Sequence, residues 1–179
     1  MGFLRSLREV KRALAKGRKI IKMSPEELSS LDDKELYEAI NVRLAYDIRW
    51  QKSENYAGFY NGAKRVFYVI NQYENEVNNG GLCQYFMNPT RLAAPYLLES
   101  LNVLGVSGHV KLLSDFLTTN NIDVNDLSSF IIKDLSEFQE LNKRYPFDDF
   151  DNAFYKLYAT EPLSDRLIAY ARQHIEEFK

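Results

Sequence analysis

Apolar residues recur every three or four positions along most of the chain, the spacing of one face of an α-helix. The segments with this spacing are 3–14, 36–48, 59–77, 97–104, 110–117, 127–141, 150–157 and 163–178. The clearest pattern joins Leu127, Phe130, Ile131, Leu135, Phe138 and Leu141. No segment alternates apolar and polar residues for long enough to predict a strand. The predicted fold class is all-α, a single compact domain of about seven to nine helices.

Short polar and glycine or proline segments mark where these helices begin and end. The run Ser24–Glu27 combines a capping residue, a proline in the first turn and two acids, which together are typical of a helix start. Asp32 or Asp33 is a suitable cap for the next helix. Pro95 is predicted to begin a later helix and Gly105 to end it.

One stretch interrupts the helical pattern, Asn78–Asn88, with the sequence NNGGLCQYFMN. The helix that contains Phe59 and Val77 reaches the glycine pair Gly80–Gly81, and an amide and aromatic cluster follows. Glycine pairs adopt backbone geometry that other residues reach only with strain. The stretch is therefore predicted to form a fixed corner between two helices.

The corner has two interpretations. In the structural one, which we favour, Gln84, Tyr85 and Asn88 hydrogen-bond the turn to neighbouring helices, since buried amides need partners. In the other, Asn79, Gln84, Tyr85 and Asn88 line a pocket for a small molecule or peptide. Amides and phenols orient ligands, but none is a good nucleophile or base at neutral pH.

Charge divides the chain into two parts. Residues 1–22 carry eight Lys/Arg and one acid, a net +7, whereas residues 23–179 carry 15 Lys/Arg and 24 Asp/Glu, a net −9. We therefore predict a basic amphipathic N-terminal arm over 1–22 and an all-α body over 23–179. The arm is expected to pack on the body or extend into solvent; weak contact with an anionic membrane surface is the alternative.

The remaining composition bears on location. Hydrophobic residues make up 45% of the chain and aromatics 13%, which argues against disorder. One cysteine excludes an internal disulfide framework and fits a reducing cytoplasm. No uninterrupted apolar core follows the basic residues, so a secretory signal is not predicted. A cytoplasmic protein is expected, peripheral to the membrane if the arm binds lipid.

The search for reactive groups mostly excludes chemistry. His109 and His174 have no Cys, His or Glu at metal-ligand spacing and are expected at the surface or at helix ends. Cys83 has no neighbouring base and is expected to fill space as a small apolar residue. The glycines at 80 and 81 follow a helix rather than a strand, so they form no nucleotide-binding loop. No metal, cofactor or catalytic activity is predicted.

The stretch Glu76–Asn88 resembles the signature of the DNA-mimic-protein-like family of bacterial helical domains. That signature is an acid, Asn-Asn-Gly-Gly, an apolar residue, Gln-Tyr/Phe-Phe and a closing Asn, and Leu82 stands where an aromatic is usual. Two weaker resemblances lie at 97–105 and in the closing helices, at 150–155 and 167–170. The resemblance covers about 33–178. Its motif residues here are Asn78, Asn79, Gly80, Gly81, Gln84, Tyr85, Phe86 and Asn88.

The resemblance implies an all-α fold without known catalysis. One type of member presents carboxylates in place of DNA phosphates, as a homodimer, and occupies a DNA-binding protein. The motif holds no such surface acids, so this activity needs an acidic face elsewhere. The candidate face is Asp134, Glu137, Glu140, Asp148, Asp149 and Asp151. The first hypothesis is a non-enzymatic protein-binding module of this kind, without direct nucleic-acid binding by the body. The second is a small-ligand domain or unrecognised enzyme that uses the corner at 79–88.

Overall fold

The computed structural model describes the backbone of residues 2–179 and the side chains of residues 11–179. Within this range the chain is helical, without a strand. The α-helices are α1 Gly2–Ile21, α2 Pro25–Ser29, α3 Asp33–Ile48, α4 Tyr56–Phe59, α5 Gly62–Met87, α6 Leu97–Leu104, α7 Ser107–Thr119, α8 Leu135–Arg144, α9 Phe147–Leu157 and α10 Leu163–Gln173. Three 3-10 helices are η1 Pro89–Tyr96, η2 Ser128–Phe130 and η3 Ile175–Phe178. The predicted all-α fold is confirmed.

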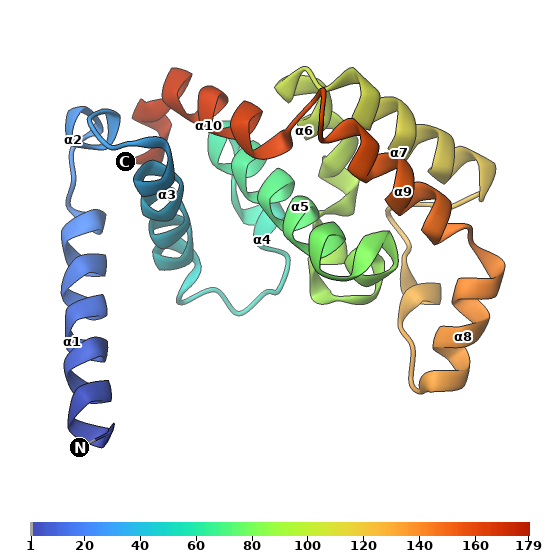
Figure 1. Ribbon diagram of the computed structural model, residues 1–179, viewed down its shortest axis with the longest axis horizontal. Helices are drawn as coiled ribbons and strands as arrows, with labels where there is room; N and C mark the ends of the chain where they lie inside the picture. Colours follow the sequence, from blue (N-terminus) through green and yellow to red (C-terminus); the bar gives the residue numbers. More distant parts are fainter. Residues whose placement is uncertain (1) are drawn as a thin grey trace.

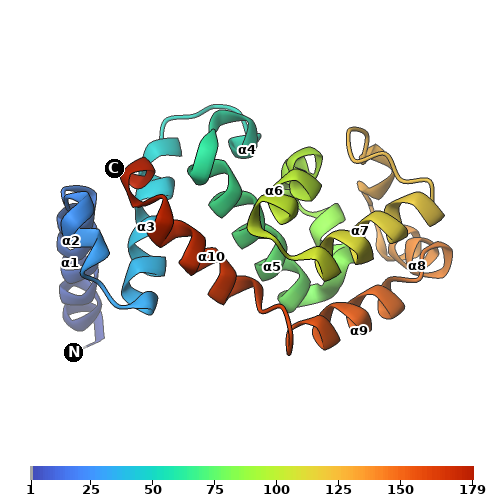
Figure 2. The same cartoon turned by 90° about the horizontal axis from the view of Figure 1, so that it is seen from above.

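Helix α5 forms the centre of the molecule. The segments η1, α6, α9 and α10 all pack against it (Figures 1 and 2). Phe67, Ile70, Tyr73 and Val77 are fully buried along its length, at the predicted helical spacing. Because α5 meets so many neighbours, a change in its course at the glycine pair repositions the elements that follow.

Several predicted helix ends are observed. Ser24 and Glu27 form a reciprocal capping box at the start of α2, and the Asp32 carboxylate accepts the Glu35 N–H at 2.8 Å at the start of α3. Gly105 ends α6 in the left-handed conformation, with φ of +73°. These caps satisfy backbone groups that the helices leave without intrahelical partners.

The predicted helix over 127–141 is wrong. The segment forms the short η2, an extended link, and then α8 from Leu135. Asp134 has extended backbone angles, and its carboxylate accepts the Glu137 N–H at 3.0 Å, so it begins a helix instead of continuing one. Leu127 and Phe130 are buried, but Leu135 is 69% exposed. The apolar spacing thus combined two segments that face different surroundings.

Two other boundaries also differ from the prediction. Phe59 belongs to the separate α4, which Asn55 caps, and its side chain is largely exposed. Pro95 lies inside η1, so the α-helix begins at Leu97 instead. Both differences arise where a separate helical segment, α4 or η1, directly precedes a longer α-helix, and the apolar pattern runs across the junction.

Helix α1 lies at one end of the molecule, and its N-terminal half extends beyond α3 (Figure 1). Its last turn is tied to the body by Arg43, whose buried guanidinium donates to the Ile20 carbonyl at 2.9 and 3.1 Å and to the Phe178 carbonyl at 2.6 Å. Gly17 lies within α1 and does not interrupt the helix. None of the helices within residues 2–179 combines the length and apolar character needed to cross a bilayer.

Candidate functional site

The corner lies within α5, where the helix breaks at the glycine pair. Gly80 has φ of −158° and ψ of 24°, and Gly81 has φ of +78° and ψ of 179°. The Gly81 conformation is essentially restricted to glycine. A Cβ atom on Gly81 would also overlap the Asp151 carboxylate, and one on Gly80 would overlap the Gln84 amide. Backbone angles and space therefore both require glycine at Gly81, whereas at Gly80 a side chain would need the space that Gln84 occupies.

Helix α9 bonds backbone groups on both sides of the break. The Tyr155 hydroxyl donates to the Val77 carbonyl at 3.0 Å. The Asp151 carboxylate accepts the Leu82 N–H at 2.9 Å on the other side of the break. Asp151 was predicted to lie on the acidic face, and no role was predicted for Tyr155.

Glu76 accepts hydrogen bonds from two amide side chains of the motif, Gln84 and Asn88. One of its carboxylate oxygens accepts from the Gln84 amide at 2.6 Å and from the Asn88 amide at 2.8 Å. The other accepts from the Thr90 hydroxyl at 3.0 Å. The acid that opens the signature thus holds its glutamine and its closing asparagine across the turn. Charge-assisted hydrogen bonds of this kind are stronger than neutral ones.

The aromatic residues of the motif belong to the core. Tyr85 and Phe86 are fully buried, and the Tyr85 ring meets Tyr73 edge-on with ring centroids 5.5 Å apart. Burial raises the pKa of the Tyr85 hydroxyl, which finds no hydrogen-bond partner among residues 11–179, so the hydrogen bond predicted for Tyr85 was wrong. Asn78 and Asn79 are exposed beside the break. The motif therefore combines two buried rings, the partly buried Glu76 clamp with Gln84 and Asn88, and two exposed amides.

The other candidate residues occupy structural positions. Cys83 is buried, and this burial raises the pKa of its thiol to about 11, which suits a space-filling residue. His109 lies in the first turn of α7 but is fully buried, with Nε2 3.0 Å from the Glu161 carbonyl oxygen, so the surface alternative was wrong. His174 ends α10, as expected. Among residues 11–179, no three His, Cys, Asp or Glu side chains gather as a metal site would require.

Five of the six acids of the candidate face lie on α8 and α9, at one end of the molecule, and the sixth, Asp134, caps the start of α8 (Figure 1). Asp134, Glu137, Glu140, Asp148 and Asp149 are exposed. Asp151 is half-buried and faces the corner, where burial raises the pKa of its carboxyl. The exposed acids lie close in sequence to three cations, Lys133, Lys143 and Arg144, and Lys143 pairs with Glu140 at 2.8 Å.

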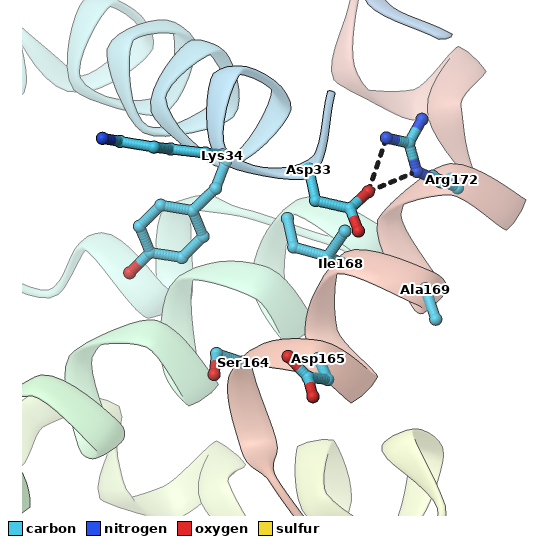
Figure 3. Close-up of a pocket in the computed structure, with 8 residues that line it drawn as sticks. Asp33, Lys34, Ser164, Asp165, Ile168, Ala169 and Arg172 are labelled. Carbon is cyan, nitrogen blue, oxygen red and sulfur yellow. Dashed lines mark hydrogen bonds and ion pairs between the residues drawn. The ribbon is translucent and has the colours of Figure 1, made fainter. Parts of the chain in front are cut away.

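A groove of about 400 Å³ lies between α3 and α10 (Figure 3). In it Asp33 of α3 and Arg172 of α10 point toward each other and pair at 2.6 Å. Its wall also contains Lys34, Tyr37, Ser164, Asp165, Ile168 and Ala169. Opposite charges within the groove neutralise one another, so the pair mainly ties the two helices together.

A buried polar network on α5 was missed by the sequence analysis. Asn71 and Glu74 are both 4% exposed. The Asn71 amide oxygen accepts a hydrogen bond from the Tyr37 hydroxyl, and the Glu74 carboxylate accepts one from the Tyr158 hydroxyl. Burial raises the pKa of Glu74, and the hydrogen bond from Tyr158 opposes this shift in part. The available signal was the run Asn71, Glu74, Asn75, Asn78, a polar face at helical spacing on an otherwise apolar helix.

Comparison with known proteins identifies a family whose range contains the motif. No curated protein and no solved structure matches the chain. The family model of DMP19-like proteins matches residues 59–174, a range that contains the Glu76 clamp, the glycine break and α9. This range is shorter than the expected 33–178 and leaves α1 to α3 outside it. It spans more than half of the chain, and the chain therefore belongs to the DMP19-like protein family.

Proposed function

We propose that the chain is a non-enzymatic protein-binding domain that acts as a DNA mimic, occupying a partner with a basic surface. The observation that carries this proposal is the exposure of Asp134, Glu137, Glu140, Asp148 and Asp149 on two consecutive helices, in a member of this family. Carboxylates on a rigid helical surface resemble the spaced negative charges of a DNA backbone.

The charge of the body supports a basic partner. Residues 23–179 have a net charge of −9, so their surface repels phosphate and attracts cationic protein surfaces. Lys143 pairs with Glu140 only at the surface, where such ion pairs contribute little, so a more basic partner can displace it. We therefore propose a DNA-binding protein as partner and no direct nucleic-acid contact by the body.

The contacts within the corner weigh against the alternative of a ligand site there. Gln84 and Asn88 donate to Glu76, and Tyr85 is fully buried, so three of the four side chains that would bind a ligand already have other roles. The signature of the family then serves the fold, and the partner is recognised by residues outside it.

Charge reversal at the acidic face tests the proposal. The variant Glu137→Lys/Asp148→Lys/Asp149→Lys is compared with Glu54→Lys/Glu99→Lys/Glu176→Lys, which changes net charge equally at exposed positions elsewhere. Tagged proteins are used to capture partners from host lysate, and each recovered protein is purified and tested for DNA binding. We expect to recover a basic DNA-binding protein, and we expect the wild-type chain to displace DNA from this purified partner.

The two variants should then separate. The acidic-face variant should associate at least tenfold more slowly with the purified partner, whereas the control should change little. Equal losses in both variants would reduce the effect to net charge and contradict the proposed face. Sedimentation velocity in the same buffer tests the homodimer that the family resemblance implies.

A further inference from the structure

Helix α1 presents a face that the body does not cover. Lys16 pairs with Glu38 of α3 at 2.8 Å, and Ile20, one turn later, is buried, so these two mark the side that faces the body. Leu14 is 58% exposed. Two residues correspond to roughly 200° around a helix, so Leu14 lies almost opposite Lys16.

The sequence places further apolar positions in line with Leu14 along the helix. Because α1 is continuous over Gly2–Ile21, the apolar positions 3, 7, 10 and 14 fall on one side of it. The helix is about 30 Å long at 1.5 Å per residue. An apolar face of this length on a projecting helix is suited to partial burial in an external surface.

The charges around this face indicate what the surface is. Lys11 and Arg18, three residues before and four residues after Leu14, border this face and are exposed, and residues 1–22 carry eight Lys/Arg against one acid. Two copies of α1 packed through their apolar faces would bring these like charges together, which disfavours a helical pair. An apolar face flanked by cations on a helix of low overall hydrophobicity is typical of binding in the interface of an anionic membrane.

The placement of α1 also suits such a surface. The body carries net −9 and would be repelled by anionic lipid, but the N-terminal half of α1 extends beyond α3 (Figure 1). Arg43 fixes the other end of α1 to the body through the Ile20 carbonyl. We propose that α1 binds anionic lipid surfaces, lying in the headgroup region with the Leu14 face inward and holding the acidic body away from the membrane.

Vesicle binding by the full chain tests the proposal. The probes are vesicles of phosphatidylcholine alone and vesicles that also contain a third of phosphatidylglycerol. We expect co-sedimentation with the anionic vesicles only, weakening as salt is raised well above about 150 mM. Lys11→Gln/Arg18→Gln/Lys19→Gln should weaken partitioning at least about tenfold, since each cation near an anionic surface contributes to binding.

Matched variants separate the contributions. Leu14→Ser should also reduce vesicle binding, whereas Val103→Ser, at an apolar position of the body that is 50% exposed, should not. Lys52→Gln/Lys133→Gln/Lys156→Gln removes three exposed body cations and should leave binding unchanged. Lack of binding to anionic vesicles, equal binding to neutral ones, or insensitivity to Leu14→Ser would overturn the proposal. So would a dimer, seen by sedimentation, that Leu14→Ser dissociates while vesicle binding is absent.

Discussion

The carboxylate of Asp151 accepts the backbone N–H of Leu82 at 2.9 Å, joining two residues 69 positions apart in the sequence. This bond caps the helical turn that restarts after the glycine break, as a capping side chain does at the start of a free-standing helix. Because the same carboxylate occupies the space that a Gly81 side chain would need, the break and its cap depend on each other.

Removal of this cap should destabilise the fold. Asp151→Ala is expected to lower the free energy of unfolding by about 1–3 kcal/mol, because it leaves the Leu82 N–H without a partner. Asp151→Asn keeps an acceptor oxygen and should cost less. Asp149→Ala, an exposed neighbour in the first turn of α9, is the control and should change stability by less than about 0.5 kcal/mol. Urea unfolding gives the comparison, and equal losses at 149 and 151 would contradict it.

Two of the glycines with positive φ, Gly81 and Gly105, should respond differently to substitution. Gly105 has φ of +73° with open space around it, so Gly105→Ala should cost only the left-handed backbone penalty, about 1–2 kcal/mol. Gly81→Ala adds overlap with Asp151 to a conformation restricted to glycine. It should therefore lower the free energy of unfolding by at least about 1 kcal/mol more than Gly105→Ala. Thermal melts of both variants check this order.

The Glu76 clamp should show coupling between its members. Gln84→Ala is expected to cost about 1–3 kcal/mol, since it removes a donor to a partly buried carboxylate. Once Glu76 is changed to alanine, Gln84→Ala should cost much less, because the contact is already absent. A double-mutant cycle by denaturant unfolding measures this coupling, and strict additivity would show that the two side chains do not interact.

Much of the fold was predictable because its signals are local. The capping box at Ser24 and the glycine stop at Gly105 depend on neighbouring residues, and both were found. The corner was found for the same reason, and its motif identified the family. The contacts of Asp151 and Tyr155 with the corner were not predicted. Both residues reach α5 from another helix, and nothing in their local sequence distinguishes them from surface residues.

The errors share a physical cause. Leu127 to Leu141 have ideal helical spacing, but the extended backbone at Asp134 separates a buried turn from a helix whose first apolar residue, Leu135, faces solvent. Periodicity measures which residues would share a face, whereas burial depends on whether another element covers that face. Buried Glu74 was missed for the complementary reason, since its partner Tyr158 lies far along the chain.

Glu74 should make stability depend on pH. Burial raises the pKa of its carboxyl above the usual 4.5. At a pH between 4.5 and this raised pKa, the folded state therefore holds a proton that the unfolded chain has lost. Its contribution to stability therefore falls as pH rises above 4.5. Glu74→Gln, which keeps an acceptor for Tyr158, should be more stable than wild type near neutral pH.

The difference between Glu74→Gln and wild type should shrink as pH is lowered, because protonated Glu74 is then also neutral. Denaturant unfolding of both proteins over a pH series measures it, and the contributions of His109 and Asp151, present in both, cancel. Glu99→Gln, at an exposed site, should match wild type throughout. A variant less stable than wild type at neutral pH would show that the fold favours the ionised carboxylate.

Two truncations should locate the boundary between the arm and the body. Removal of residues 1–15 keeps Lys16 and Ile20 and should leave the melting temperature nearly unchanged. Removal of residues 1–22 also takes away the Ile20 carbonyl that Arg43 binds and the buried Ile20 side chain. It should cost at least about 1–3 kcal/mol more, because the buried guanidinium then loses the carbonyl that accepts two of its hydrogen bonds. Circular dichroism melts compare the two, with Arg43→Lys in the full chain as a check that the guanidinium is responsible. Equal melting temperatures for both truncations would place the boundary at residue 22 and make the arm separable up to that point.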